Sequence, residues 1–183
     1  MANRLFVASV VLASVLELGL GLEDANADPQ PEPTLIPPVN PACISSPFGP
    51  RVLANHPQAG SYHYGVDLPA PPGASIVATA PGKVIRMQKK GPGGLEILVQ
   101  HDGFIGIYSH LGIAVPSFAQ GKRTVAAGEK LGVVGRTGVT VGTHVYFEML
   151  IAGKPVDPTP YLRVPTCGRE VRPPSPASSP RSQ

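Results

Sequence analysis

Two short motifs place histidines beside groups that bind metals or move protons. His63 and Asp67 lie four residues apart, and Gly65 between them allows the backbone to turn. An imidazole and a carboxylate that meet at one point can bind a divalent metal, although the same spacing also fits a turn with a capping Asp and a surface His. His144 and Tyr146 would project from one face of a strand, because strand side chains alternate.

Two further polar residues follow predicted strand segments. His110 comes directly after Tyr108 and Ser109, at the end of one such segment. Glu148 shares the predicted strand face of His144 and Tyr146, and Glu is a frequent general base in zinc enzymes. We interpret Glu148 as a supporting group rather than the base.

The elements that must position these residues are short strands. Alternating apolar segments predict strands at residues 83–87, 95–100, 105–108, 130–134 and 145–150. Gly and Pro contribute 21 and 23 of the 183 residues, and they gather in the turns between these segments. No stretch has the pattern of a long amphipathic helix. The sequence therefore predicts an all-β domain with a mostly antiparallel sheet.

The two ends of the chain differ from this body. Residues 1–27 have a positive start, an apolar run and an Ala-Asn-Ala cleavage site, as in a signal peptide. Residues 28–41 predict a Pro-rich linker, 42–167 the folded domain and 168–183 a disordered tail rich in Pro and Ser. We therefore expect export to the periplasm, cell envelope or extracellular space, with no transmembrane segment in the mature chain.

Cysteine and charge support this expectation. Cys43 and Cys167 bracket the domain, which favours a disulfide in an oxidising compartment, with two free thiols as the alternative. Removing residues 1–27 leaves a net charge of +5. This modest, scattered charge suits an anionic envelope and argues against nucleic acid as a partner.

The motifs occur in a familiar order along the chain. They are SPFGPR at 46–51, HYGVD at 63–67, YSHL at 108–111, GEKLGVVGRTG at 128–138, GTHVYFEM at 142–149 and VDPTPYL at 156–162. With these motifs and their spacing, residues 44–162 resemble the lysostaphin-type (LytM-like) zinc metallopeptidases of peptidoglycan. The resemblance implies a compact β-sheet domain with a substrate groove, one Zn²⁺ and peptidoglycan as partner.

The resemblance also implies roles for individual residues. His63 and Asp67 would be zinc ligands, and His110 and His144 would be the catalytic pair that acts on the metal-bound water and the transition state. The third ligand position, a His in the family, is occupied here by Tyr146. The framework histidines, His56 and His101, are interpreted as structural.

Tyr146 leaves three outcomes open. A phenol has a reference pKa of about 10 and must ionise to bind a metal well, whereas an imidazole binds in its neutral form. The site could bind zinc through Tyr146, hold it weakly without Tyr146, or be empty. Because the other site residues remain, the sequence favours a zinc endopeptidase that cleaves stem or cross-bridge peptides of peptidoglycan. The alternative is a degenerate, non-catalytic module that binds peptidoglycan or activates another cell-wall hydrolase.

Overall fold

The computed structural model describes residues 34–52 and 60–168. The predicted signal peptide, the predicted tail beyond Gly168, and His56 lie outside these residues. The described elements are, in chain order, β1 (Gly49–Pro50), β2 (Tyr62–His63), β3 (Gly65–Pro69), β4 (Ser75–Val77), β5 (Gly82–Lys89), β6 (Leu95–His101), β7 (Ile105–Ala114), α1 (Pro116–Ala119), β8 (Thr124–Val125), β9 (Lys130–Val134), β10 (His144–Ile151), β11 (Lys154–Val156) and α2 (Thr159–Leu162).

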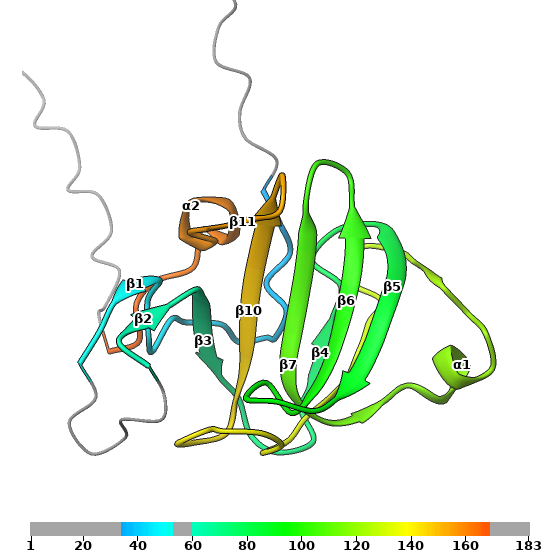
Figure 1. The fold of residues 1–183 in the computed structure, drawn as a ribbon, viewed down its shortest axis with the longest axis horizontal. Helices are drawn as coiled ribbons and strands as arrows, with labels where there is room; N and C mark the ends of the chain where they lie inside the picture. The colour runs from blue at the N-terminus through cyan, green and yellow to red at the C-terminus, as the bar shows by residue number, and fades with distance from the viewer. Residues whose placement is uncertain (1–33, 53–59, 169–183) are drawn as a thin grey trace, which may run out of the picture. The chain divides into compact units, whose positions relative to one another are not determined.

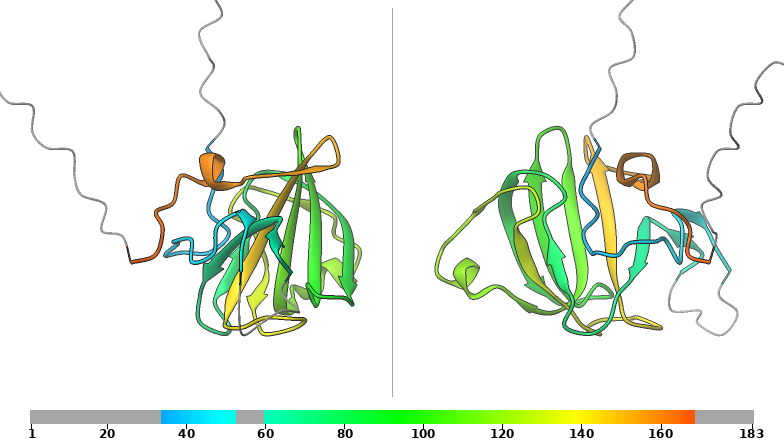
Figure 2. Two further views of the ribbon diagram at one scale, coloured as in Figure 1. Left: turned by 60° about the vertical axis from the view of Figure 1, so that its left-hand side comes forward. Right: turned by 180° about the vertical axis from the view of Figure 1, so that it is seen from behind.

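Within the described residues, nine strands form one antiparallel sheet and β1 and β2 form a separate pair. The main path runs β11-β10-β7-β6-β5-β8, with β3 on β10 and β9 joining β7 to β4. Strands β4 and β9 lie behind β5 to β7 in Figure 1 and in front of them in the right-hand view of Figure 2. The buried core includes side chains from both groups, such as Ile76, Leu131, Val84 and Val99. The predicted all-β, mostly antiparallel fold is confirmed.

The five predicted strand segments all lie within observed strands. The prediction for β9 has the observed bounds, while β5, β6, β7 and β10 extend beyond the predicted segments. The largest difference is β7, which runs six residues past Tyr108 because its second half changes partner from β10 to β9. Alternate side chains of β10 are buried, as the pattern predicts.

Strand β3 was missed because its sequence, Gly-Val-Asp-Leu-Pro, is short and was interpreted as a turn. Gly65 is an extended residue of this strand rather than a turn residue. A Cβ at Gly65 would lie 2.4 Å from the carbonyl oxygen of Phe147 and 2.8 Å from the Tyr146 ring. Glycine is therefore needed here for the close approach of β3 to β10.

The fold begins before the predicted boundary at residue 42. Leu35 and Val39 are almost completely buried in the core. The backbone N–H of Leu35 donates to the carbonyl of Tyr161, and that of Ile36 to the carbonyl of Thr79. Residues 34–41 of the predicted linker thus pack against the domain, because two apolar side chains between the prolines reach its core.

A disulfide joins Cys43 to Cys167 across 124 residues, as the sequence favours. The backbone beside it is also paired, since Ile44 and Thr166 form a bridge. In the chain-entropy account, closing a loop of this length stabilises the fold by about 4–5 kcal/mol. The covalent bond therefore holds the two ends of the domain together.

A buried polar network links β6 and β7 to the segment between β4 and β5. Tyr108 is fully buried, and its hydroxyl accepts a hydrogen bond from the backbone N–H of Thr79 at 2.9 Å. The same hydroxyl lies 2.9 Å from the Thr79 Oγ1 and 3.2 Å from the His101 Nε2. The other ring nitrogen of His101 donates to the carbonyl of Pro81. His101, interpreted as structural from the sequence, lies at the centre of this core network.

Replacing Tyr108 by Phe should lower the free energy of unfolding by about 1–3 kcal/mol, because buried groups of Thr79 and His101 lose their partner. Chemical denaturation monitored by circular dichroism measures this change. The matched control is Tyr161→Phe, since the Tyr161 hydroxyl has no hydrogen bond within the described residues. Equal stability of the Tyr108→Phe variant and the unchanged chain would contradict the network's role.

Candidate functional site

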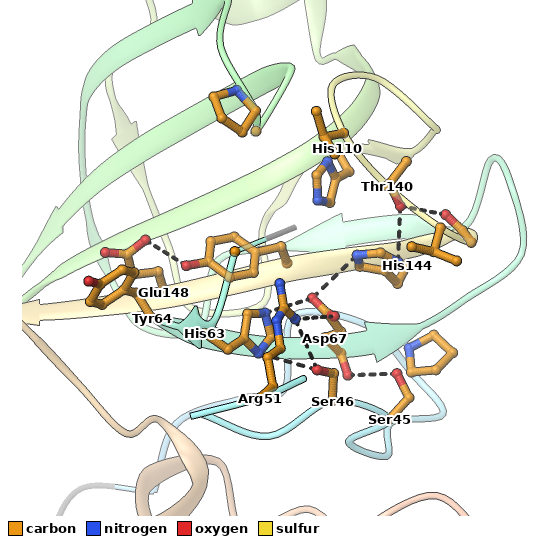
Figure 3. A pocket seen from close by; sticks show the side chains of 18 of the residues that line it. Ser45, Ser46, Arg51, His63, Tyr64, Asp67, His110, Thr140, His144 and Glu148 are labelled. Atoms are coloured by element: carbon orange, nitrogen blue, oxygen red, sulfur yellow. Dashed lines mark hydrogen bonds and ion pairs between the residues drawn. The ribbon is translucent and has the colours of Figure 1, made fainter. Parts of the chain in front are cut away.

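Asp67 lies at the centre of the candidate site. Its Oδ1 is 3.2 Å from the Nε2 of His63 and 3.3 Å from the Nε2 of His144. On the other side of the carboxylate, an Nη1 of Arg51 lies 3.7 Å from Oδ2. Figure 3 shows these side chains pointing toward Asp67. The structure therefore brings His63 and Asp67 of the early motif next to His144 of the late strand.

Hydrogen bonds orient both imidazoles. The Nδ1 of His63 lies 2.9 Å from the carbonyl oxygen of Pro47. The Nδ1 of His144 lies 3.3 Å from the Thr140 Oγ1, whose hydroxyl donates to the carbonyl of Gly142. In each ring the Nδ1 side is held by the chain, and Nε2 is the atom that reaches Asp67.

Electrostatics keep Asp67 ionised. Burial alone would raise the pKa of its carboxyl group, but the hydrogen bonds and charges of His144 and His63 lower the pKa well below its ordinary value. A carboxylate with this surrounding is a fixed negative charge at neutral pH. It can attract a cation or a hydrogen-bond donor of a ligand.

His110 lies beside this centre rather than on Asp67. Its ring contacts the His144 ring edge to face, with centroids 4.9 Å apart. Its Nδ1 donates to the carbonyl of Thr137 at 2.9 Å, and its backbone φ is +64°. A left-handed conformation is costly for a residue with a Cβ, and strained residues of this kind cluster at functional sites. Burial lowers the pKa of the His110 imidazole, which favours its neutral form.

Tyr146 is directed away from Asp67. Its Cα pairs with that of Asp67 across β3 and β10, so the two side chains start from the same face. The phenol hydroxyl nevertheless donates to the Glu148 Oε2 at 2.8 Å. Burial and the nearby Glu148 carboxylate raise the pKa of the phenol. The hydroxyl is therefore a neutral donor to Glu148.

Glu148, the partner of Tyr146, interacts electrostatically with a second glutamate, Glu96. Burial raises the pKa of Glu148, with a further contribution from the charge of Glu96. Glu96 accepts hydrogen bonds from Ser109 and Gln88 at 2.8 and 2.6 Å. Neither Glu96 nor Ser109 was predicted from the sequence as a site residue. Strand alternation indicates that both side chains lie on a polar face of the sheet. It does not indicate which strands are neighbours, so it could not place them beside Glu148.

These residues line one cavity of about 1080 Å³. Its floor carries the histidines, Asp67, Tyr146 and the two glutamates. One wall is formed by Tyr62 and Tyr64, and another by Arg136, Val139 and Val141. Loop and edge residues supply both walls, and sequence periodicity gives no information on their positions. The cavity is wide enough for an extended polymer or peptide segment.

The zinc site implied by the resemblance requires three protein ligands at one point. His63 and Asp67 are in place, but Tyr146 presents its hydroxyl to Glu148 instead. The Nε2 atoms of both imidazoles lie 3.2 and 3.3 Å from the Asp67 Oδ1. Among residues 34–52 and 60–168, no group of three or more His, Cys, Asp or Glu side chains is arranged to hold a metal ion. The side-chain arrangement does not fit zinc.

Comparison with known proteins places the chain in a family. The family model for Peptidase family M23 matches residues 61–158. The DD-carboxypeptidase/endopeptidase Mpg of Neisseria meningitidis is 37% identical over 118 residues, which are 63% of this chain and 26% of that protein. The murein hydrolase activator NlpD of Salmonella typhimurium is 32% identical over 114 residues, 61% of this chain and 29% of that protein. The chain thus spans about a quarter of these relatives.

Solved structures agree with this placement. A zinc containing peptidase from Vibrio cholerae has 31% identity and a TM-score of 0.58, covering 69% of this chain and 39% of that one. The catalytic domain of lysostaphin from Staphylococcus simulans has 26% identity and a TM-score of 0.55, covering 67% of this chain and 92% of that domain. The family model spans more than half of the sequence, and the fold matches solved relatives. The chain belongs to peptidase family M23.

Proposed function

We propose that this chain is a peptidoglycan-binding protein of the cell envelope that acts without zinc catalysis. Its groove would hold a stem or cross-bridge peptide and direct another cell-wall hydrolase to it. The observation that carries the proposal is the hydrogen bond from the Tyr146 hydroxyl to Glu148. Tyr146 occupies the sequence position of the family's third zinc ligand, and its hydroxyl bonds to Glu148 rather than facing His63 and Asp67.

The groove itself favours binding. The cavity of about 1080 Å³ retains a polar floor and two walls, although the ligand set is incomplete. The fixed charge of Asp67 and the exposed guanidinium of Arg136 offer opposite charges to a peptide. A pocket with these features can bind a zwitterionic peptide without cleaving it.

The names of the relatives support both the ligand and the location. One relative is named a murein hydrolase activator and others are named peptidoglycan DD-endopeptidases. Proteins of both kinds act at the cell wall, which agrees with the export signal expected from residues 1–27. No helix in the described part of the chain is long and apolar enough to cross a membrane.

Zinc endopeptidase activity, which the sequence alone favours, is the second candidate. The observation in its favour is that His63, Asp67, His110 and His144 are all retained and gather at one end of the groove. This candidate requires a third ligand that Tyr146, in its observed conformation, does not provide. Metal content separates the two candidates.

Restoring the family ligand should create a zinc site. The chain as it stands should purify with less than about 0.1 equivalents of zinc, whereas Tyr146→His should bind about one equivalent. Zinc at 100 times its dissociation constant would stabilise that variant by about 2.7 kcal/mol. Elemental analysis and thermal melts with and without zinc measure both effects.

Two controls make the metal test specific. Tyr146→Phe removes the hydroxyl without adding a ligand, so it should bind no more zinc than the unchanged chain. Adding His63→Ala to Tyr146→His should abolish the gain. One equivalent of tightly bound zinc in the unchanged chain would overturn the zinc-free proposal in favour of the endopeptidase.

Arg136 should contribute to peptide binding. It is exposed on the groove wall and makes no ion pair within the described residues, so it is available to a peptide carboxylate. Arg136→Ala should weaken binding of a synthetic stem pentapeptide about two- to fivefold, as for an exposed ion pair, and should reduce its salt dependence. Isothermal titration calorimetry measures the affinity.

The matched control for this variant is Arg86→Ala. Arg86 is equally charged and exposed, but it lies on β5 outside the groove. Its replacement should leave the pentapeptide affinity unchanged. An equal loss in both variants would mean that net charge, and not the position of Arg136, determines binding.

A further inference from the structure

Two exposed tyrosines form one wall of the groove. Tyr62 and Tyr64 retain 39% and 52% of their accessible surface, which is unusual for large aromatic side chains that are in contact with each other. They flank His63, whose side chain is buried. Tyr62 belongs to β2 and Tyr64 lies between β2 and β3, and both side chains line the cavity together with His63.

The two rings form a preorganised surface. Their centroids lie 4.9 Å apart with the planes tilted by 42°. Phe48 holds Tyr62 from the other side by an edge-to-face contact at 5.5 Å. Pairing of β1 with β2 fixes the backbone beneath Tyr62. Rigid aromatic side chains lose little conformational entropy on binding, so such a pair is suited to ligand contact.

The polar atoms of this wall are also available. Neither tyrosine hydroxyl has a hydrogen-bond partner among the residues that the structure describes. The wall therefore offers two flat apolar faces and two uncharged hydroxyls. The charged groups of the cavity, Arg51, Asp67 and Arg136 among them, come from other segments.

We propose that Tyr62 and Tyr64 form a saccharide subsite, on which a sugar ring of the glycan strand stacks while the attached peptide occupies the charged part of the groove. A pyranose ring has an apolar C–H face that packs on an aromatic ring, and its rim of hydroxyls can bond to the phenol hydroxyls. An amino sugar acetylated on nitrogen is neutral, which matches this wall. This inference rests on the proposed function, because it assigns the glycan part of the same ligand.

The test measures the binding of two separate ligands to the full chain. One is chitotetraose, a soluble neutral tetramer of β-1,4-linked N-acetylglucosamine, and the other is the synthetic stem pentapeptide. Calorimetry should show saturable binding of both probes. The double variant Tyr62→Ala/Tyr64→Ala should bind chitotetraose about tenfold more weakly and the pentapeptide within about twofold of the unchanged chain.

Two further variants separate stacking from unfolding or general loss of apolar surface. Tyr62→Phe/Tyr64→Phe keeps both rings, so it should retain chitotetraose binding within about threefold. Ile85→Ala/Met87→Ala removes two exposed apolar side chains of β5 outside the groove, and should change nothing. Saturation-transfer NMR on the unchanged chain should transfer signal from tyrosine ring protons to the sugar.

Three other outcomes would contradict either the tyrosine subsite or the proposed function. Equal chitotetraose affinity in the double alanine variant, or a loss in the β5 control instead, would overturn the tyrosine subsite. Binding of the pentapeptide but not of chitotetraose would overturn the subsite and leave the proposed function standing. Binding of neither probe would overturn the proposed function as well.

Discussion

The central constraint of this molecule is the pairing of β10 on both of its edges. One edge pairs with β3, which places Tyr146 opposite Asp67, and the other pairs with β7, which places Tyr146 opposite Ser109. Because the side chains of β10 alternate, His144, Tyr146 and Glu148 face the groove while Val145 and Phe147 enter the core. A slip of one residue would bury the polar set, so core packing fixes the register of the site.

Tyr146 lies at the middle of this polar set on β10, and its hydroxyl determines the hydrogen bonding of Glu148. The Tyr146 hydroxyl bonds to Glu148, and the Nε2 atoms of His63 and His144 lie next to Asp67. The hydrogen bonds and charges of the two imidazoles hold the pKa of Asp67 below its ordinary value, so the groove carries a fixed negative charge.

The sequence predicted the all-β class, the strands that carry His110 and His144, and the disulfide between Cys43 and Cys167. The alternation of apolar residues and the Gly and Pro residues in turns predict the strands from short stretches of sequence. The resemblance located the candidate residues, and strand alternation placed Tyr146 and Glu148 on one face of β10. The close approach of the Tyr146 ring to Gly65, however, joins two different strands. Contacts of this kind, and the groove walls at Tyr64 and Arg136, depend on tertiary packing that no local pattern encodes.

The central claim is that Tyr146 bonds to Glu148 and leaves His63 and Asp67 without a third ligand. The most direct measurement is a crystal structure of the unchanged chain grown with excess zinc, with anomalous data collected at the zinc edge. The account predicts no anomalous peak between His63 and Asp67, and a Tyr146 hydroxyl within hydrogen-bond distance of Glu148. A peak coordinated by His63 and Asp67, with either Tyr146 or His144 as third ligand, would contradict it.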